Sequence, residues 1–217
     1  MKSGKVVLPT STASDHRQMT GYLAVPSSGT PSGSILLIQE IFGVTPAMRA
    51  IADDLASNGH LVLVPDIYWR LAPELELGNG EDPVERDQAV AYSKQYDETL
   101  GTADLVAGVD WLQSKVACAA RPAVVGFCLG GRMAVRVAAK TALSCMVSMY
   151  GVGLDRMASE ISSIRSPVQF HFGDNDNHNP MPVIDAVRRI VQDRNNKRDE
   201  FFLYTGVEHA LDRKSVV

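Results

Sequence analysis

The chain has 217 residues and a net charge of −4; 45% of its residues are hydrophobic and 21% are charged. A chain of this size can bury one substantial core, so we expect a single domain over residues 1–217. The charge balance leaves no basic surface suited to a phosphate backbone, which argues against nucleic acid as a partner.

The apolar runs and the cysteine spacing were compared with the patterns of signal peptides, membrane spans and metal sites. No apolar run is long enough for a signal-peptide core or a membrane span, so a cytoplasmic protein without membrane contact is the default expectation. Cys118, Cys128 and Cys145 do not have the C-x-x-C spacing of zinc or redox sites. We therefore expect free thiols, no metal and no cofactor. Nothing in the sequence demands a second subunit, and a monomer is expected.

The first elements in chain order are two short β-rich runs, 5–8 and 21–25, which predict an antiparallel hairpin at a sheet edge. Six later runs are continuously apolar, as is typical of parallel strands that are covered on both faces. These runs span residues 34–39, 61–65, 123–127, 145–150, 168–172 and 200–204.

Helices between these strands are marked by N-caps and by proline in the first turn, since Thr45 precedes Pro46 and Asp82 precedes Pro83. Helices are expected over residues 46–58, 82–100 and 102–116, after the glycine pair 130–131 and after residue 182. The alternation predicts an α/β fold, a three-layer sandwich around a mostly parallel, doubly wound sheet. In such a sheet, reactive groups lie on loops at the carboxyl ends of the strands.

One cysteine stands where a predicted strand becomes a predicted helix, in Gly126-Phe127-Cys128-Leu129-Gly130-Gly131. The spacing matches the nucleophile elbow G-x-S-x-G, with sulfur in place of oxygen. The residue at the tip of that turn is strained, and only small residues two positions away let strand and helix approach. Cys128 would stand at the positive end of the helix, which favours the thiolate form, and the Leu129 N–H would face a developing oxyanion.

A free cysteine is more commonly a small core residue, and we interpret Cys118 and Cys145 in that way. For Cys128, the position, the flanking glycines and the residues that follow favour a nucleophile. The glycines do not form a dinucleotide-binding fingerprint, because G-x-x-x-G-G lacks the G-x-G-x-x-G spacing and no acidic residue stands at the expected later strand end.

An elbow nucleophile is followed along the chain by an acid and then by a histidine. His209 comes after the last predicted strand, where a base would lie, and we predict it as the general base. The other histidines are interpreted as structural or surface residues: His16, His60, His171 and His178.

The acid is expected in the loop after the preceding strand, which contains Asp174 and Asp176. The spacing alone favours neither carboxylate. This loop also looks like the start of a calcium loop, but its sixth position is Asn179 and its twelfth is Asp185, where glycine and glutamate would be required. A metal site is therefore not predicted.

Several motifs can be considered together: Gln39-Glu40-Ile41-Phe42-Gly43-Val44, Gly126-Phe127-Cys128-Leu129-Gly130-Gly131, Tyr150-Gly151-Val152-Gly153, Gly173-x-x-Asp176 and His209. Their combination resembles the dienelactone hydrolases, also called carboxymethylenebutenolidases, of the α/β-hydrolase fold. The resemblance runs from about residue 34 to residue 213. It implies that the acid is the last residue of G-x-x-D, which selects Asp176, and that the triad is Cys128, Asp176 and His209.

The resemblance also implies roles for residues outside the triad. Ile41 would supply a second oxyanion donor through its backbone N–H, and Glu40 would contact the resting thiol. A carboxylate at that position could equally be one that sits at a helix N-terminus without a catalytic role. Arg86 and Arg213 correspond to the family's carboxylate-binding arginines, since guanidinium groups bind carboxylates in a bidentate way.

Three departures from the family pattern concern the pocket wall and the end of the chain. Leu211 stands where the family often has an aromatic residue after the histidine, and Val90 and Ser93 replace aromatics that line the pocket. The fold also usually adds a closing helix after the histidine. These differences affect the expected substrate more than the expected chemistry.

The resemblance implies a cysteine-dependent hydrolase that opens dienelactone, 4-carboxymethylenebut-2-en-4-olide, to maleylacetate through a thioester, in the degradation of aromatic and chloroaromatic compounds. Thiolate leaves more readily than alkoxide, so an enol ester is a better substrate for such a site than an ordinary ester or amide. The alternatives are a hydrolase of another small activated ester or lactone that carries a carboxylate, a thiol-based redox protein, and a binding module without catalysis.

Overall fold

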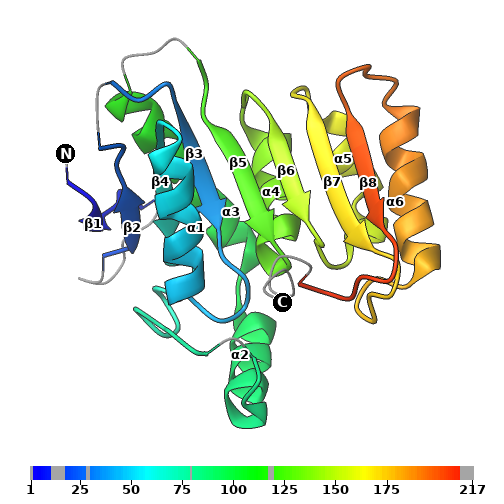
Figure 1. Cartoon of the computed structure of the whole chain (residues 1–217), viewed down its shortest axis with the longest axis horizontal. Coiled ribbons are helices and arrows are strands. Elements are labelled where there is room, and N and C mark those ends of the chain that lie inside the picture. Colours follow the sequence, from blue (N-terminus) through cyan, green and yellow to red (C-terminus); the bar gives the residue numbers. More distant parts are fainter. Residues whose placement is uncertain (1, 11–17, 28–29, 79, 117–119, 211–217) are drawn as a thin grey trace. The chain divides into compact units, whose positions relative to one another are not determined.

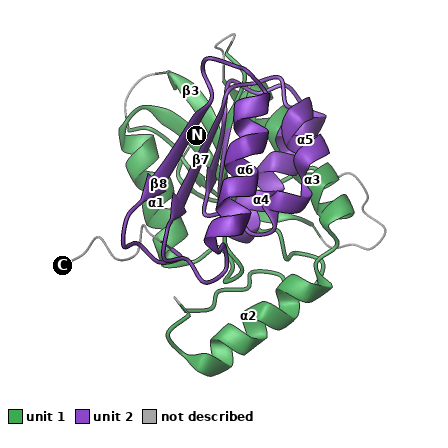
Figure 2. Cartoon of the chain, turned by 90° about the vertical axis from the view of Figure 1, so that its right-hand side faces the viewer, with its two compact units in different colours: residues 1–123 green, residues 124–217 purple. Residues whose placement is uncertain are grey.

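Strands and helices alternate along the chain in a computed structural model that describes residues 2–10, 18–27, 30–78, 80–116 and 120–210 (Figure 1). The strands are β1 (Gly4–Val7), β2 (Thr20–Ala24), β3 (Gly33–Ile38), β4 (His60–Pro65), β5 (Ala123–Phe127), β6 (Met146–Met149), β7 (Val168–Gly173) and β8 (Glu200–Tyr204). The helices are α1 (Pro46–Ser57), α2 (Pro83–Gln95), α3 (Glu98–Lys115), α4 (Leu129–Lys140), α5 (Ala158–Ser163) and α6 (Met181–Asp193), with a 3₁₀ turn η1 (Leu154–Arg156). The structure has two compact units, residues 1–123 and residues 124–217 (Figure 2).

The first unit contains the predicted N-terminal hairpin and a parallel pair. Strand β2 pairs antiparallel with β1 and with β4, and β3 pairs parallel with β4. Helices α1 and α3 lie on opposite faces of these strands (Figure 2). The apolar strands of this unit are therefore covered on both faces, as predicted.

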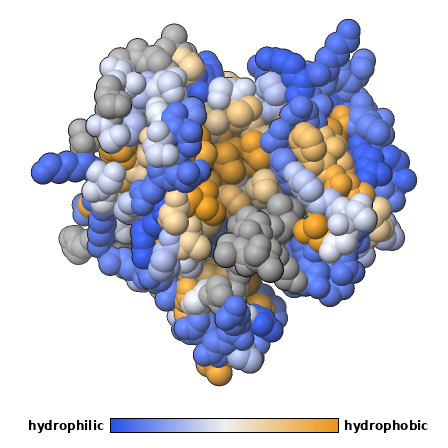
Figure 3. Space-filling view, viewed as in Figure 1, coloured by the Kyte–Doolittle hydropathy of each residue, from blue (hydrophilic) through white to orange (hydrophobic). Residues whose placement is uncertain are grey.

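The second unit has four parallel strands in the order β5, β6, β7, β8. Its described helices α4, α5 and α6 lie on one face (Figure 2). On the other face, Val147 and Met149 of β6 are only partly buried, and Figure 3 shows apolar side chains gathered there. The prediction that helices cover both faces of the strands is thus wrong for the described part of this unit. Its described helices pack on one face, so alternating residues of β6 face different surroundings.

The boundary between the second and third helices differs from the predicted one. Helix α2 ends at Gln95 and α3 begins at Glu98, whereas a break between residues 100 and 102 was expected. The carboxylate of Asp97 accepts hydrogen bonds from the N–H groups of Thr99 and Leu100, at 2.9 and 3.0 Å, so Asp97 is the N-cap. Thr102 lies inside the helix, where its hydroxyl donates to a backbone carbonyl.

The first two predicted N-caps are confirmed. Thr45 accepts a hydrogen bond from the Met48 N–H at 3.3 Å, and Asp82 accepts one from the Val84 N–H at 2.8 Å. Helices α4 and α6 begin at Leu129 and Met181, slightly earlier than expected, while η1 and α5 were not predicted. No helix in the described ranges is long and apolar enough to cross a membrane.

Candidate active site

Cys128 occupies a sharp turn at the carboxyl end of β5. Its backbone angles are φ 54° and ψ −113°, a left-handed conformation that side-chain-bearing residues rarely adopt. The Cys128 N–H donates to the Met149 carbonyl at 3.0 Å, and the Cys128 carbonyl accepts from the Arg132 N–H at 3.2 Å. The cysteine is half-buried and is the N-cap of α4, which is the geometry that the glycine spacing predicts for an elbow.

At two glycines near Cys128, Gly126 and Gly131, neighbouring backbone atoms leave no space for a side chain. A Cβ atom on Gly126 would lie 2.0 Å from the Gly130 carbonyl oxygen. A Cβ atom on Gly131 would lie 2.8 Å from the Cα atom of Gly151, in the loop after β6. These contacts explain why strand, helix and neighbouring loop can approach one another only at glycine.

A histidine and a buried carboxylate meet near the carboxyl ends of β7 and β8. His209 follows β8, and its Nδ1 atom lies 2.7 Å from Oδ2 of Asp176 in the loop after β7. The Asp176 side chain is 0% exposed and that of His209 is 18% exposed. A buried carboxylate that accepts from Nδ1 fixes the tautomer and the orientation of the imidazole, which leaves Nε2 for proton transfer.

Asp176 is held by donors from its own loop. The Asp176 carboxylate accepts hydrogen bonds from the His178 N–H at 2.7 Å, the Asn179 N–H at 3.2 Å and the Asn179 side-chain amide at 2.9 Å. Burial alone would raise the pKa of Asp176, but the hydrogen bonds from His209 and Asn179 outweigh it and lower the pKa below its ordinary value. The carboxylate is therefore ionised at neutral pH.

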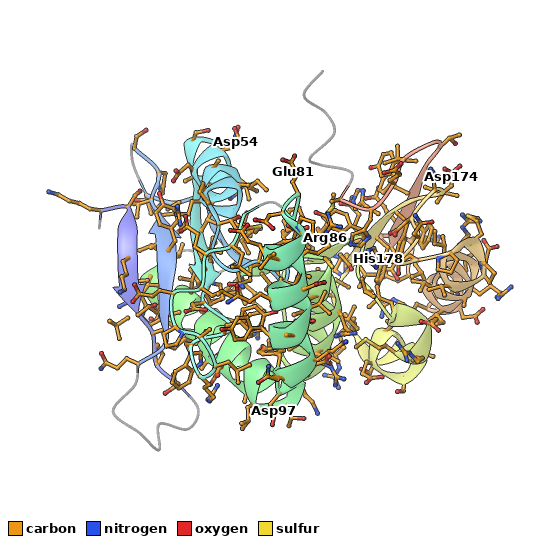
Figure 4. The ribbon with its side chains drawn as sticks, turned by 90° about the horizontal axis from the view of Figure 1, so that it is seen from below. Asp54, Glu81, Arg86, Asp97, Asp174 and His178 are labelled. Atoms are coloured by element: carbon orange, nitrogen blue, oxygen red, sulfur yellow. The ribbon has the colours of Figure 1, made fainter. Side chains whose placement is uncertain are left out.

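Asp174, the other acid of this loop, has a different role. Its carboxylate accepts a hydrogen bond from the Gly206 N–H at 2.7 Å, and its N–H donates to the Tyr204 carbonyl at 3.0 Å. In Figure 4, Asp174 lies at the outer edge of the second unit and His178 lies farther in along the loop. The structure thus brings Asp176 to His209, while Asp174 ties the loop to the turn after β8.

The His209 ring also interacts with Cys128. Nε2 is buried, and among the described residues it has no hydrogen-bond partner of normal geometry. Burial alone would lower the pKa of His209, but the hydrogen bond to Asp176 and the interactions with Cys128 raise the pKa to about 10. A protonated imidazole between a carboxylate and a sulfur atom stabilises a thiolate, which is the reactive form of cysteine.

Among the described residues, two aromatic rings contact His209. The buried Tyr150 ring lies 4.8 Å from the His209 ring, centroid to centroid, at an interplanar angle of 67°. The His178 ring lies 4.6 Å away at 59°. His178 is exposed, as expected of a loop residue, but its contact with His209 was not predicted. Sequence reasoning also missed Asn179, which was considered only as a calcium-loop position; the D-x-x-N spacing was its one signal.

The remaining histidines have structural positions or lie outside the description. His171 is half-buried within β7, where its ring stacks on Phe202 and Tyr204 and bonds to the Tyr204 hydroxyl at 2.8 Å. His60 is the first residue of β4. His16 lies outside the described residues, as does Cys118, whereas Cys145 is a half-buried free thiol.

Glu40 and Ile41 lie in the loop after β3 in the first unit. Glu40 is 9% exposed, and Ile41 is half-buried. The next residues are fixed by backbone hydrogen bonds, since the Leu77 N–H donates to the Phe42 carbonyl at 2.9 Å. Gly43 has φ 93°, and a Cβ atom there would lie 1.8 Å from the Leu75 carbonyl oxygen. This loop is rigidly held, as an oxyanion loop must be, and the roles of Glu40 and Ile41 stay predictions.

Arg86 lies in the first turns of α2 in the same unit (Figure 4). Its Nε atom donates to the Gly80 carbonyl at 2.8 Å, and Nη2 also contacts that oxygen. The guanidinium has five N–H donors, so these contacts use two of them. Val90 and Ser93, farther along α2, are half-buried. Arg213 and Leu211 lie outside the described residues.

Comparisons with known proteins give a consistent result. The chain matches the dienelactone hydrolase family over residues 19–216. It is 36% identical over 196 residues to carboxymethylenebutenolidase 1 of Cupriavidus pinatubonensis, covering 89% of this chain and 81% of that protein. It is 38% identical over 156 residues to the carboxymethylenebutenolidase of Pseudomonas sp. strain P51, covering 71% of this chain and 64% of that protein.

A solved structure shares the fold. The structure of a candidate dienelactone hydrolase from Klebsiella pneumoniae superposes with a TM-score of 0.80 at 24% identity, covering 98% of this chain and 90% of the other. The predicted α/β-hydrolase fold, a mostly parallel sheet with helices around it, is thereby confirmed.

Proposed function

The chain belongs to the dienelactone hydrolase family, and we propose that it opens a small enol lactone bearing a carboxylate, with Cys128 as the nucleophile. It is a hydrolase that acts on a carboxylic ester or lactone bond. The observation that carries the proposal is the position of His209, whose Nδ1 atom lies 2.7 Å from the buried carboxylate of Asp176 and whose ring interacts with Cys128.

In the first half of the proposed reaction, the Cys128 thiolate attacks the lactone carbonyl carbon. The Leu129 N–H at the start of α4 and the Ile41 N–H stabilise the oxyanion. The ring C–O bond then breaks, the enolate leaves, and the acyl group remains on sulfur as a thioester. Because an enolate is a better leaving group than an alkoxide, the adduct collapses forward instead of expelling the thiolate.

In the second half, water attacks the thioester carbonyl. His209, after it has given its proton to the leaving enolate, or the product enolate itself takes the proton from this water, and the thiolate leaves. The net reaction adds one water to the lactone, so dienelactone yields maleylacetate. Asp176 keeps the imidazole in the orientation that both halves need. Arg86 and Arg213 are proposed to bind the carboxylate of the substrate, as charged bidentate donors.

The decisive experiment is hydrolysis of cis- and trans-dienelactone by wild type, Cys128→Ala and Cys145→Ala. We expect turnover by wild type and by the Cys145 variant, which changes another half-buried thiol, and none by Cys128→Ala. Mass spectrometry of rapidly quenched wild type should detect the acyl group on Cys128. The nucleophile assignment is wrong if Cys128→Ala turns over at the wild-type rate.

The substrate class can be tested separately with a neutral enol ester. Replacing Arg86 by alanine should raise KM for the anionic lactone much more than KM for the neutral ester. Equal increases would count against carboxylate binding, since the loss of the Gly80 contact affects both substrates in the same way. Turnover of other activated esters without turnover of either dienelactone would favour a related hydrolase.

A further inference from the structure

The reaction described above gives no role to His178, although its ring contacts His209. The two ring centroids are 4.6 Å apart with an interplanar angle of 59°. The other ring in contact with His209, that of Tyr150, is 0% exposed, whereas His178 is exposed. His178 therefore lies on the solvent side of this histidine.

The backbone that carries His178 is fixed to the same carboxylate that orients His209. The His178 N–H and the Asn179 N–H both donate to Oδ1 of Asp176, at 2.7 and 3.2 Å. The Asn179 amide also donates to Oδ2 of Asp176 at 2.9 Å and to the Tyr150 carbonyl at 3.4 Å. These bonds close a tight turn, so the position of the His178 side chain is set relative to the hydrogen bond between Asp176 and His209.

The protonation states of the two rings make their contact favourable at neutral pH. His209 is protonated there, since Asp176 and Cys128 raise its pKa to about 10. Burial and the nearby charge of His209 lower the pKa of His178, so His178 is neutral. A neutral aromatic ring beside an imidazolium is attractive, in the manner of a cation–π contact. Within the described part of the second unit, His209 and Asp176 are the charged groups that act on His178.

We propose that His178 is a positioning residue, whose ring restrains the imidazole of His209 in the orientation in which Nδ1 bonds to Asp176 and the ring interacts with Cys128. The His178 ring also keeps water from the hydrogen bond between Nδ1 and Asp176. The proposal rests on the proposed function only in taking His209 as the base. In this role the aromatic ring matters and its nitrogen atoms do not. Phenylalanine at position 178 should therefore preserve the function, and alanine should not. Catalysis depends on such alignment because a small misorientation of the base lowers the rate of proton transfer.

The test that does not need a substrate uses Cys128 alone. In a Cys118→Ala, Cys145→Ala background, alkylation by iodoacetamide at pH 7 reports the thiolate that His209 stabilises. We expect His178→Ala to slow alkylation about fivefold and His178→Phe to restore it to within twofold of the parent. Asn177→Ala, an exposed neighbour in the same loop, should leave the rate unchanged. Equal rates for the alanine variant and the parent would overturn the proposal.

Proton NMR gives a spectroscopic readout of the same restraint. The Nδ1 proton of His209, bonded to Asp176, should give a resolved downfield resonance in wild type and in His178→Phe. In His178→Ala, faster exchange with water should broaden it. A sharp resonance in a folded alanine variant would contradict the shielding role. If the alanine variant does not fold, His178→Gln, which also lacks a ring, decides in its place.

Steady-state kinetics on dienelactone separate positioning from substrate contact. We expect His178→Ala to lower kcat about tenfold with KM within twofold of wild type, and His178→Phe to recover kcat. A change in KM with kcat unchanged would mean that His178 touches the substrate, and the positioning role would be wrong. If wild type opens neither lactone, the proposed function fails, while alkylation and NMR still test the role of His178.

Discussion

The Nδ1 atom of His209 lies 2.7 Å from Oδ2 of Asp176, and the Asp176 side chain is 0% exposed. This hydrogen bond joins residues 33 positions apart and decides which of two nearby aspartates can serve the base. Asp174 instead bonds to the Gly206 N–H. The same chemical change at the two positions should therefore have different consequences.

The first prediction compares Asp176→Asn with Asp174→Asn. Asparagine at position 176 cannot stabilise the imidazolium and favours the wrong tautomer of His209, so kcat should fall by about 10²–10⁴-fold. Asparagine at position 174 keeps an acceptor for the Gly206 N–H, so kcat should stay within about threefold of wild type. The measurement is hydrolysis of dienelactone by each purified variant. A larger loss of kcat at position 174 than at position 176 would contradict the assignment of the acid.

The second prediction concerns the pH dependence of stability. The pKa of His209 is raised from an ordinary value of 6.5 to about 10 in the folded chain. A raised pKa means that the folded state binds the proton more tightly than the unfolded state. The stabilisation by protonated His209 is therefore fully present below about pH 6.5 and is lost as the pH rises through about 10.

This effect can be measured as a difference between two proteins. The free energy of unfolding in urea should favour wild type over His209→Gln most strongly near pH 6, and the difference should shrink steadily toward pH 10. Cys128→Ala should weaken the dependence, because interactions with Cys128 contribute to the raised pKa. A difference that is constant over this range would show that His209 titrates near its ordinary value.

The elbow could be predicted from the sequence because every signal for it is local. Gly126, Cys128 and Gly131 lie within six consecutive residues, and the close approach of other backbone atoms leaves no space for a side chain at either glycine. The acid could not be chosen from spacing, since Asp174 and Asp176 are two residues apart in one loop. The resemblance to a family selected Asp176. The structure explains that choice, because the loop after β7 brings Asp176 to His209 and Asp174 to the Gly206 N–H.

Two other features depend on competition that a sequence does not reveal. Asp97 and Thr102 are both good N-cap residues, and Asp97 caps α3 because its carboxylate reaches two N–H groups. The contact of His178 with His209 arises because loops after two different strands meet, and no periodicity in the sequence records such a meeting. Propensity patterns predict single elements well but leave the pairing of loops undetermined.

The third prediction tests the steric origin of the elbow. A Cβ atom on Gly126 would lie 2.0 Å from the Gly130 carbonyl oxygen, so Gly126→Ala forces strand and helix apart. We expect a loss of about 3 kcal/mol or more in the free energy of unfolding. At Gly33, in β3, the nearest atom to an added Cβ is 3.5 Å away, and Gly33→Ala should change stability by less than about 1 kcal/mol. Urea unfolding of both variants makes the comparison, and equal losses would mean that the clash is not the cause.

The fourth prediction separates a buried from an exposed ion pair in the second unit. Arg194 and Asp199 have side chains that are 4% and 3% exposed, and Nε lies 2.7 Å from Oδ2. Arg194 also donates to the Ile164 and Ser166 carbonyls, at 2.7 and 3.0 Å, so it joins α5, α6 and the start of β7. Asp199→Asn keeps the shape but leaves the guanidinium without its counter-charge, which should cost about 3–5 kcal/mol.

The matched control is Asp185→Asn, because Asp185 pairs with Arg188 at 3.2 Å while the two side chains are 42% and 34% exposed. Solvent screens that pair, and its loss should cost less than about 1 kcal/mol. Urea unfolding at pH 7 gives the two values. If the two substitutions cost the same, the Arg194 side chain is held by its backbone carbonyl partners, and its charge pair with Asp199 contributes no more than a surface pair.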